Sequence, residues 1–211
     1  MILAARRARA ALLLALGILL GACAPAAKEP NFTMPSVGPA HIDVDTPVLR
    51  AAKAAAGIHD CPQISGPAVA GGLPEVTLRC LGGGHDVNLA ALRGPLVINY
   101  WGAWCEPCRR ELPILQAYAD AAAGRVALIG VDFQDMIPAE AIDLLAAKGV
   151  TYPSLADPGG DSDGKPPLRI RTVPMLVFVD AEGRVVHQEF AEMKSVKQLE
   201  GLVAEHLGVR P

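Results

Sequence analysis

Several features that would point to a particular function are missing from this sequence of 211 residues. Its most apolar stretch, residues 10–20, is shorter than the roughly 20 apolar residues that cross a bilayer as a helix. Beyond its first 22 residues it has no cluster of basic residues, and over the whole sequence 22 acidic residues outnumber 19 lysines and arginines, so no surface for nucleic acid is expected. With 51% apolar residues and no repeat period, the chain is expected to be globular, with room for one ordinary domain.

Cysteine is scarce, and its odd count of five raises the question of compartment. Exported proteins usually pair their thiols, whereas a cytosolic protein can leave all of them reduced. The N-terminus favours export, because three arginines precede the apolar stretch 10–20 and two small residues follow it. A basic start, an apolar stretch and a small-residue cleavage zone indicate a secretory signal peptide at residues 1–22.

Cys23 accounts for the odd cysteine. The segment Leu20-Gly21-Ala22-Cys23 resembles the lipobox at which bacterial prolipoproteins are cut before a cysteine that carries lipid. We therefore expect a diacylglycerol thioether on Cys23, which leaves an even number of other cysteines; the alternative is ordinary secretion with a free thiol. Removal of residues 1–22 takes away three arginines and no acidic residue, so the net charge changes from −3 to −6.

The mature chain is expected to contain a tether, a helix and one main domain. Residues 23–45 contain four prolines and no apolar period, which is typical of an extended, flexible tether. Thr46 and Pro47 resemble a helix start, so residues 46–72 are expected to form an N-terminal helix and a connecting segment. The main domain then occupies residues 73–208.

Strand-like and helix-like blocks alternate along the main domain. Strands are expected at residues 75–80, 86–89, 96–101, 126–133, 175–179 and 184–190, and helices at residues 105–123, 138–148 and 195–207. This order predicts an α/β fold with a central mixed β-sheet flanked by helices. The nearly continuous apolar strand 96–101 is expected to be covered on both faces.

The segment most informative about chemistry runs from Trp101 to Cys108, where the buried strand gives way to a helix. Two cysteines three residues apart at a helix start lie on one face, with a Cα separation of about 5.5 Å that suits a disulfide. The positive potential of the helix N-terminus stabilises a thiolate at Cys105, which is the candidate nucleophile. Cys108, one turn inside the helix, is the candidate resolving thiol.

Neighbouring residues are expected to tune this pair. Pro107 fits the first helical turn, where its missing N–H is not needed. The acidic side chain of Glu106 opposes the thiolate and makes the couple more reducing, whereas Arg109 and Arg110 act in the opposite direction.

Two other arrangements of Cys105 and Cys108 are compatible with the sequence: a static structural disulfide, or half of a zinc site completed by Cys61 and Cys80. Structural zinc usually takes two close-spaced pairs, whereas Cys61 and Cys80 are 19 residues apart. We expect neither a metal nor another cofactor, and the five histidines are scattered. The favoured fate of Cys61 and Cys80 is a structural disulfide, and a redox relay with Cys105 is the alternative.

The motif Trp104-Cys105-Glu106-Pro107-Cys108 after an apolar strand, with Asn99 before it and Glu111 after it, resembles the TlpA/ResA-like branch of the AhpC/TSA-thioredoxin superfamily. The resemblance covers about residues 73–207. It implies a thioredoxin fold with an N-terminal helix/hairpin extension and a central βα insertion. It also implies that Glu111 accepts a proton during catalysis, although the sequence equally allows a solvated Glu111 on an exposed helix face.

The resemblance also implies a substrate-binding surface. Val173-Pro174 precedes an apolar strand, where thioredoxin-like proteins have a cis-proline beside the redox disulfide. The residue before that proline offers backbone groups to an extended substrate, so Trp104, Val173 and Pro174 are the expected substrate contacts. Peroxidase relatives have a Thr-x-x-Cys turn, which this sequence lacks at Cys105.

Together these patterns predict a lipid-anchored thiol–disulfide oxidoreductase on the extracytoplasmic face of a bacterial cell membrane. Its expected partners are protein disulfide substrates and a membrane electron donor, and a monomer is expected. The family favours a reductase that serves cytochrome c maturation or copper-protein assembly. Two alternatives are a disulfide-forming oxidase and a non-catalytic binding lipoprotein.

Overall fold

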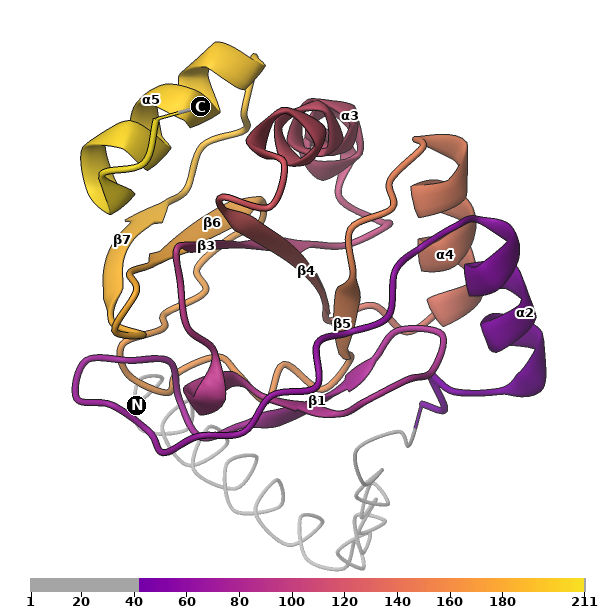
Figure 1. The fold of residues 1–211 in the computed structure, drawn as a ribbon. Helices are drawn as coiled ribbons and strands as arrows, with labels where there is room; N and C mark the ends of the chain where they lie inside the picture. Colours follow the sequence, from indigo (N-terminus) through magenta and orange to yellow (C-terminus); the bar gives the residue numbers. More distant parts are fainter. Residues whose placement is uncertain (1–41, 211) are drawn as a thin grey trace, which may run out of the picture. The chain divides into compact units, whose positions relative to one another are not determined.

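The computed structural model describes residues 42–210 (Figure 1). The expected signal peptide 1–22, the lipid-bearing Cys23 and most of the tether 23–45 lie outside the described residues. Within residues 42–210, no helix is both long enough and apolar enough to cross a membrane.

The described residues build one mixed sheet with the strand order β2-β1-β5-β4-β3-β6-β7. The strands are β1 (Thr77–Cys80), β2 (Val87–Asn88), β3 (Leu96–Trp101), β4 (Ala127–Phe133), β5 (Ser154–Asp157), β6 (Met175–Val179) and β7 (Val185–Glu189). Strand β4 pairs in parallel with β3 and β5, and the remaining pairs are antiparallel. The expected α/β class with a mixed sheet is confirmed.

Helices flank this sheet (Figure 1). They are α2 (Pro47–Ala55), α3 (Glu106–Ala122), α4 (Pro138–Ala147) and α5 (Val196–Leu207), with a short 3₁₀ turn, η1 (Leu89–Ala91). Helix α3 packs beside α5, and α2 packs beside α4. Helix α2 begins as predicted, since the Thr46 hydroxyl accepts a hydrogen bond from the Leu49 N–H at 3.2 Å.

Strand β5 was missing from the sequence-based prediction. It bridges β4 and the N-terminal strand β1, so it joins the first hairpin to the rest of the sheet. Its four residues Ser-Leu-Ala-Asp have little intrinsic preference for strand, and only the flanking strands fix their conformation. The prediction of a second hairpin arm at 86–89 was too long, because the chain leaves β2 after Asn88 and turns into η1.

The central strand β3 places the redox motif. All six of its residues are buried, as expected of a strand covered on both faces. Its antiparallel register with β6 sets Tyr100 opposite Met175. The end of β3 therefore lies beside the start of β6, which brings the segment that follows Trp101 next to the segment that precedes Met175.

Candidate active site

Cys105 and Cys108 form a disulfide at the N-terminus of α3, with a Cα–Cα distance of 5.3 Å. Cys105 is the N-cap residue of the helix, and its sulfur accepts a hydrogen bond from the Cys108 N–H at 3.2 Å. The sulfur of Cys105 thus occupies the position that a side-chain oxygen usually takes at a helix N-cap. A negative charge on this sulfur faces the positive end of the helix dipole.

The two cysteines differ in accessibility. Cys105 is 4% exposed, whereas Cys108 is completely buried. An incoming sulfur can therefore approach only Cys105, as expected of the nucleophile in a pair whose second thiol resolves a mixed disulfide.

The peptide bond between Val173 and Pro174 is cis, and it lies against the disulfide. The Val173 carbonyl oxygen is 3.6 Å from the Cys105 sulfur. Trp104 stands beside them with 59% of its surface exposed. The three residues expected to contact substrate are therefore gathered around Cys105. A hollow next to them is lined by Trp104, Phe133, Gln134, Ile170, Arg171, Thr172 and Val173.

Glu106 points into solvent at the first position of α3. Its carboxylate forms ion pairs with Arg109 at 3.7 Å and Arg110 at 3.5 Å, and all three side chains are substantially exposed. Arg110 also makes a shorter ion pair with Glu192 at 2.7 Å, and hydrogen bonds from Arg110 and Lys194 lower the pKa of Glu192 to about 2. Solvent screens exposed pairs of this kind, so the negative charge of Glu106 is only partly compensated near Cys105.

Glu111 is completely buried, so the interpretation as a solvated charge on an exposed face is wrong. One carboxyl oxygen accepts a hydrogen bond from the Met193 N–H at 2.9 Å, and the other has no partner within the described part of the chain. Burial raises the pKa of Glu111 to about 8. A buried carboxyl one turn beyond Cys108 on the same helix face can exchange a proton near neutral pH.

Tyr152 joins this buried polar group, and sequence reasoning missed it. Its hydroxyl accepts a hydrogen bond from the Asn99 side-chain N–H at 3.4 Å. Burial raises the pKa of Tyr152, with a smaller contribution from the nearby charge of Glu111. Tyr152 reaches Asn99 from 53 residues along the chain, and no local pattern in the sequence signals that contact.

Two further carboxyl groups, also missed, lie near the segment before Cys105, and one of them is hydrogen-bonded to it. Asp135 accepts a hydrogen bond from the Ala103 N–H at 2.8 Å and another from the Ile137 N–H at 3.0 Å. Asp132 lies beside Asp135, and burial together with that neighbour raises the pKa of Asp132 well above its ordinary value. Asp135 therefore fixes the backbone two residues before the nucleophile.

Cys61 and Cys80 form a separate disulfide with a Cα–Cα distance of 5.8 Å, so neither is joined to Cys105. Both residues belong to the hydrophobic core. Among residues 42–210, no three His, Cys, Asp or Glu side chains are grouped as they are around a metal ion.

The chain matches the model of one protein family and is similar in sequence to proteins named for thiol–disulfide exchange. The model of the AhpC/TSA family matches residues 69–188. The chain is 30% identical over 161 residues to thiol:disulfide interchange protein DsbE of Allochromatium vinosum, covering 72% of this chain and 84% of that protein. It is 29% identical over 120 residues to thiol-disulfide oxidoreductase ResA of Bacillus thuringiensis, covering 56% of this chain and 67% of that protein.

A solved structure shows the same fold. An uncharacterized thioredoxin-like protein from Porphyromonas gingivalis matches with a TM-score of 0.52 at 26% identity, over 64% of this chain and 92% of that chain. The similarity confirms the thioredoxin-like α/β fold that the resemblance implied.

Proposed function

Because the chain belongs to the AhpC/TSA family and is a thiol–disulfide oxidoreductase of the ResA/DsbE type, we propose that it reduces disulfides of exported proteins while anchored to a bacterial membrane. The observation that carries the proposal is the contact between the Cys105 sulfur and the carbonyl of Val173, which precedes cis-Pro174. It places the more accessible sulfur of the pair beside backbone along which an extended client segment can pair.

The first half of the reaction takes place at Cys105. Its thiolate, stabilised by the start of α3, attacks one sulfur of the client disulfide. A mixed disulfide forms, and the other client sulfur leaves as a thiolate. The exposed ring of Trp104 and the hollow beside it contact the client while the mixed disulfide exists.

Cys108 completes the reaction from inside the helix. Its thiol loses a proton and attacks the Cys105 sulfur, which releases the second client thiolate and closes the Cys105–Cys108 disulfide. We assign Glu111 as the acceptor of that proton, since its pKa of about 8 lies close to the ordinary value of a thiol, about 8.5. A membrane dithiol then supplies two electrons and restores the reduced pair.

We propose the reducing direction from the charge at the helix start. Glu106 stands next to Cys105, and its exposed ion pairs with Arg109 and Arg110 compensate it only in part. A less stabilised thiolate makes the pair a better reductant. The family resemblance adds the client class: paired cysteines of apocytochrome c or of copper-delivery proteins. The midpoint potential of the Cys105/Cys108 couple tests the direction.

We propose that the anchor is a lipid on Cys23, on the strength of the lipobox-like segment that precedes it. The intact mass of protein extracted from membranes tests this. We expect a chain that begins at Cys23 and carries added diacylglycerol. A chain that begins at Ala24, or at Cys23 without added mass, contradicts the anchor and leaves the redox function untouched.

A further inference from the structure

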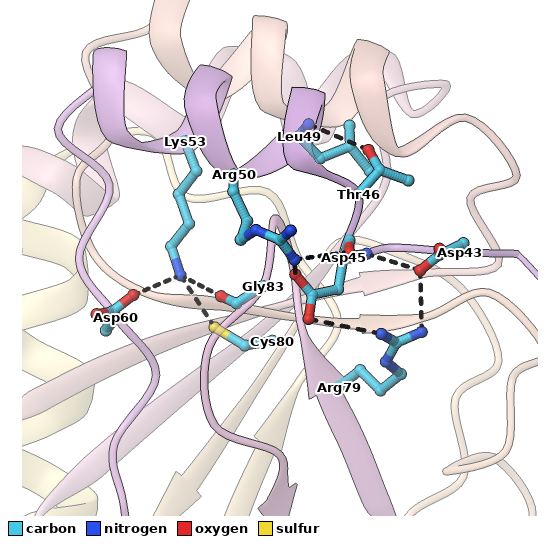
Figure 2. A network of polar contacts seen from close by, with 10 residues as sticks. All are labelled: Asp43, Asp45, Thr46, Leu49, Arg50, Lys53, Asp60, Arg79, Cys80 and Gly83. Carbon is cyan, nitrogen blue, oxygen red and sulfur yellow. Dashed lines mark hydrogen bonds and ion pairs between the residues drawn. The ribbon is translucent and has the colours of Figure 1, made fainter.

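A buried lysine, Lys53, lies against one sulfur of the second disulfide, and Figure 2 shows its ammonium group directed at the Cys80 sulfur. Lys53 of α2 is only 4% exposed. Its ammonium group donates to the Cys80 sulfur at 3.3 Å and to the Gly83 carbonyl at 2.7 Å, and it pairs with Asp60 at 3.0 Å. The Lys53 ammonium group therefore has three acceptors, as many as it has hydrogens, and one of them is a sulfur of the disulfide.

This arrangement suits a thiolate better than a disulfide. The sulfur of a disulfide is a weak, uncharged acceptor, whereas a thiolate forms a charge-assisted hydrogen bond with an ammonium group. The carboxylate that balances Lys53, Asp60, has a side chain that is 80% exposed, so solvent screens its attraction. The buried cation therefore gains most when Cys80 carries a negative charge.

Both sulfurs lie near one acceptor, the Ser154 carbonyl oxygen, which is 3.8 Å from the Cys80 sulfur. The Cys61 sulfur lies 3.4 Å from the carbonyl oxygen of Ser154, an acceptor to which a thiol can donate its hydrogen. The Ser154 carbonyl is closer to Cys61 and the Lys53 ammonium donates to Cys80, so in a reduced pair Cys61 is the better placed to keep its hydrogen and Cys80 to carry the negative charge.

A glycine turn separates Cys80 from solvent. Gly84 is exposed, and a side chain at that position would place its Cβ 3.4 Å from the Cys80 sulfur. Lys53, Asp60 and the glycines 82–84 line a surface hollow at the same place. Cys80 itself is only 1% exposed, so this turn and the Lys53 side chain beside it must shift before a reagent reaches its sulfur.

We propose that Cys61–Cys80 is a second redox-active disulfide, with Cys80 as its exchanging sulfur and Lys53 as the positioning residue that holds Cys80 as a thiolate. Its partner is a dithiol. This site is independent of the reaction assigned to Cys105 and Cys108.

The exchange proceeds in two steps. A thiolate of the dithiol attacks the Cys80 sulfur, the bond between Cys80 and Cys61 breaks, and Cys61 takes the proton of the donor's second thiol. The second sulfur of the dithiol then attacks the first, which is bonded to Cys80 in the mixed disulfide. The bond to Cys80 breaks, and Cys80 leaves as a thiolate beside Lys53. The dithiol is oxidised to a disulfide, and two electrons reduce the pair.

The test uses the full chain with Cys105→Ser and Cys108→Ser, equilibrated with mixtures of reduced and oxidised dithiothreitol at pH 7. Alkylation followed by peptide mass analysis reports Cys61 and Cys80 separately. We expect Lys53→Met to move the equilibrium about tenfold or more toward the disulfide, because a charge-assisted hydrogen bond is lost. Lys53→Arg should restore most of the share of reduced Cys61 and Cys80 that Lys53→Met loses. Arg50→Met, which removes a neighbouring cation of α2 that pairs with Asp45, should leave the equilibrium unchanged.

A second measurement needs no change at Lys53. In the reduced protein Cys80 should alkylate faster than Cys61, and circular dichroism should show that the domain stays folded during the exchange. Equal equilibria with Lys53 and Lys53→Met, faster alkylation of Cys61, or reduction only after unfolding would each overturn the proposal. In the chain that retains Cys105 and Cys108, Lys53→Met should leave reduction of a protein disulfide unaffected.

Discussion

Cys105→Ser is expected to lower the rate of protein-disulfide reduction by more than about 10³-fold, because a hydroxyl is a far weaker nucleophile than the thiolate it replaces. Cys108 cannot substitute for it, since it is completely buried behind Cys105. The measurement is the initial rate of insulin reduction with a dithiol as electron donor, on protein whose circular dichroism matches that of the unmodified chain.

Cys108→Ala is the matched comparison, because it keeps the nucleophile and removes only the resolving thiol. It should form the mixed disulfide at Cys105 at a normal rate and then stall, so that a covalent complex with the client accumulates. Full activity of Cys105→Ser would contradict the assignment of Cys105 as the nucleophile. No exchange of the unmodified Cys105–Cys108 pair with a dithiol or with insulin would favour a non-catalytic binding protein that uses the thioredoxin-like fold as a scaffold.

Glu111→Gln is expected to change the pH dependence of the resolving step. The proton acceptor must be ionised, so the rate of release of a client from the mixed disulfide should rise as pH increases toward about 8 in the unmodified protein, following the pKa of Glu111. Glutamine cannot accept the proton, so the rate below pH 8 should fall, and the rise that remains should come only from direct ionisation of the Cys108 thiol. The same rise in both proteins would remove Glu111 from the reaction.

The same substitution should change stability in a pH-dependent way. The folded-state pKa of Glu111, about 8, is higher than the unfolded value of 4.5, so its protonated form stabilises the fold. That contribution is fully present below about pH 4.5 and is lost as pH rises to about 8, which amounts to about 3 kcal/mol between pH 5 and pH 8. The loss should be absent in Glu111→Gln.

Urea unfolding at pH 5 and at pH 8 measures this difference. Glu140→Gln is the control, because Glu140 is an exposed carboxylate in the first turn of α4. It should retain the full pH dependence of the free energy of unfolding. Identical pH dependence in Glu111→Gln and the unmodified protein would contradict the raised pKa of Glu111.

The redox pair could be predicted from sequence because all of its determinants are local. An apolar strand, a helix start and two cysteines three residues apart lie in one short segment, so strand and helix periodicity together place Cys105 at the helix N-terminus. Thr46 and Pro47 were equally informative for α2, since capping depends on neighbours within one turn.

Features that depend on contacts between distant segments could not be predicted from the sequence. Glu111 is buried and accepts its hydrogen bond from the backbone at Met193, 82 residues further along the chain. Strand β5 exists because β4 and β1 flank it, and its own residues do not favour a strand. Lys53 looks like an ordinary helix lysine in the sequence, and only the packing of α2 brings it to Cys80.

The midpoint potential of the Cys105/Cys108 couple tests most directly whether the protein works as a reductase. Equilibration with a dithiol buffer of known potential, read out on the peptide that contains both cysteines, gives this value separately from the Cys61–Cys80 pair. A reductase should show a potential well below about −200 mV. A potential near about −120 mV, which is typical of a protein that introduces disulfides, would contradict the proposed direction of electron flow.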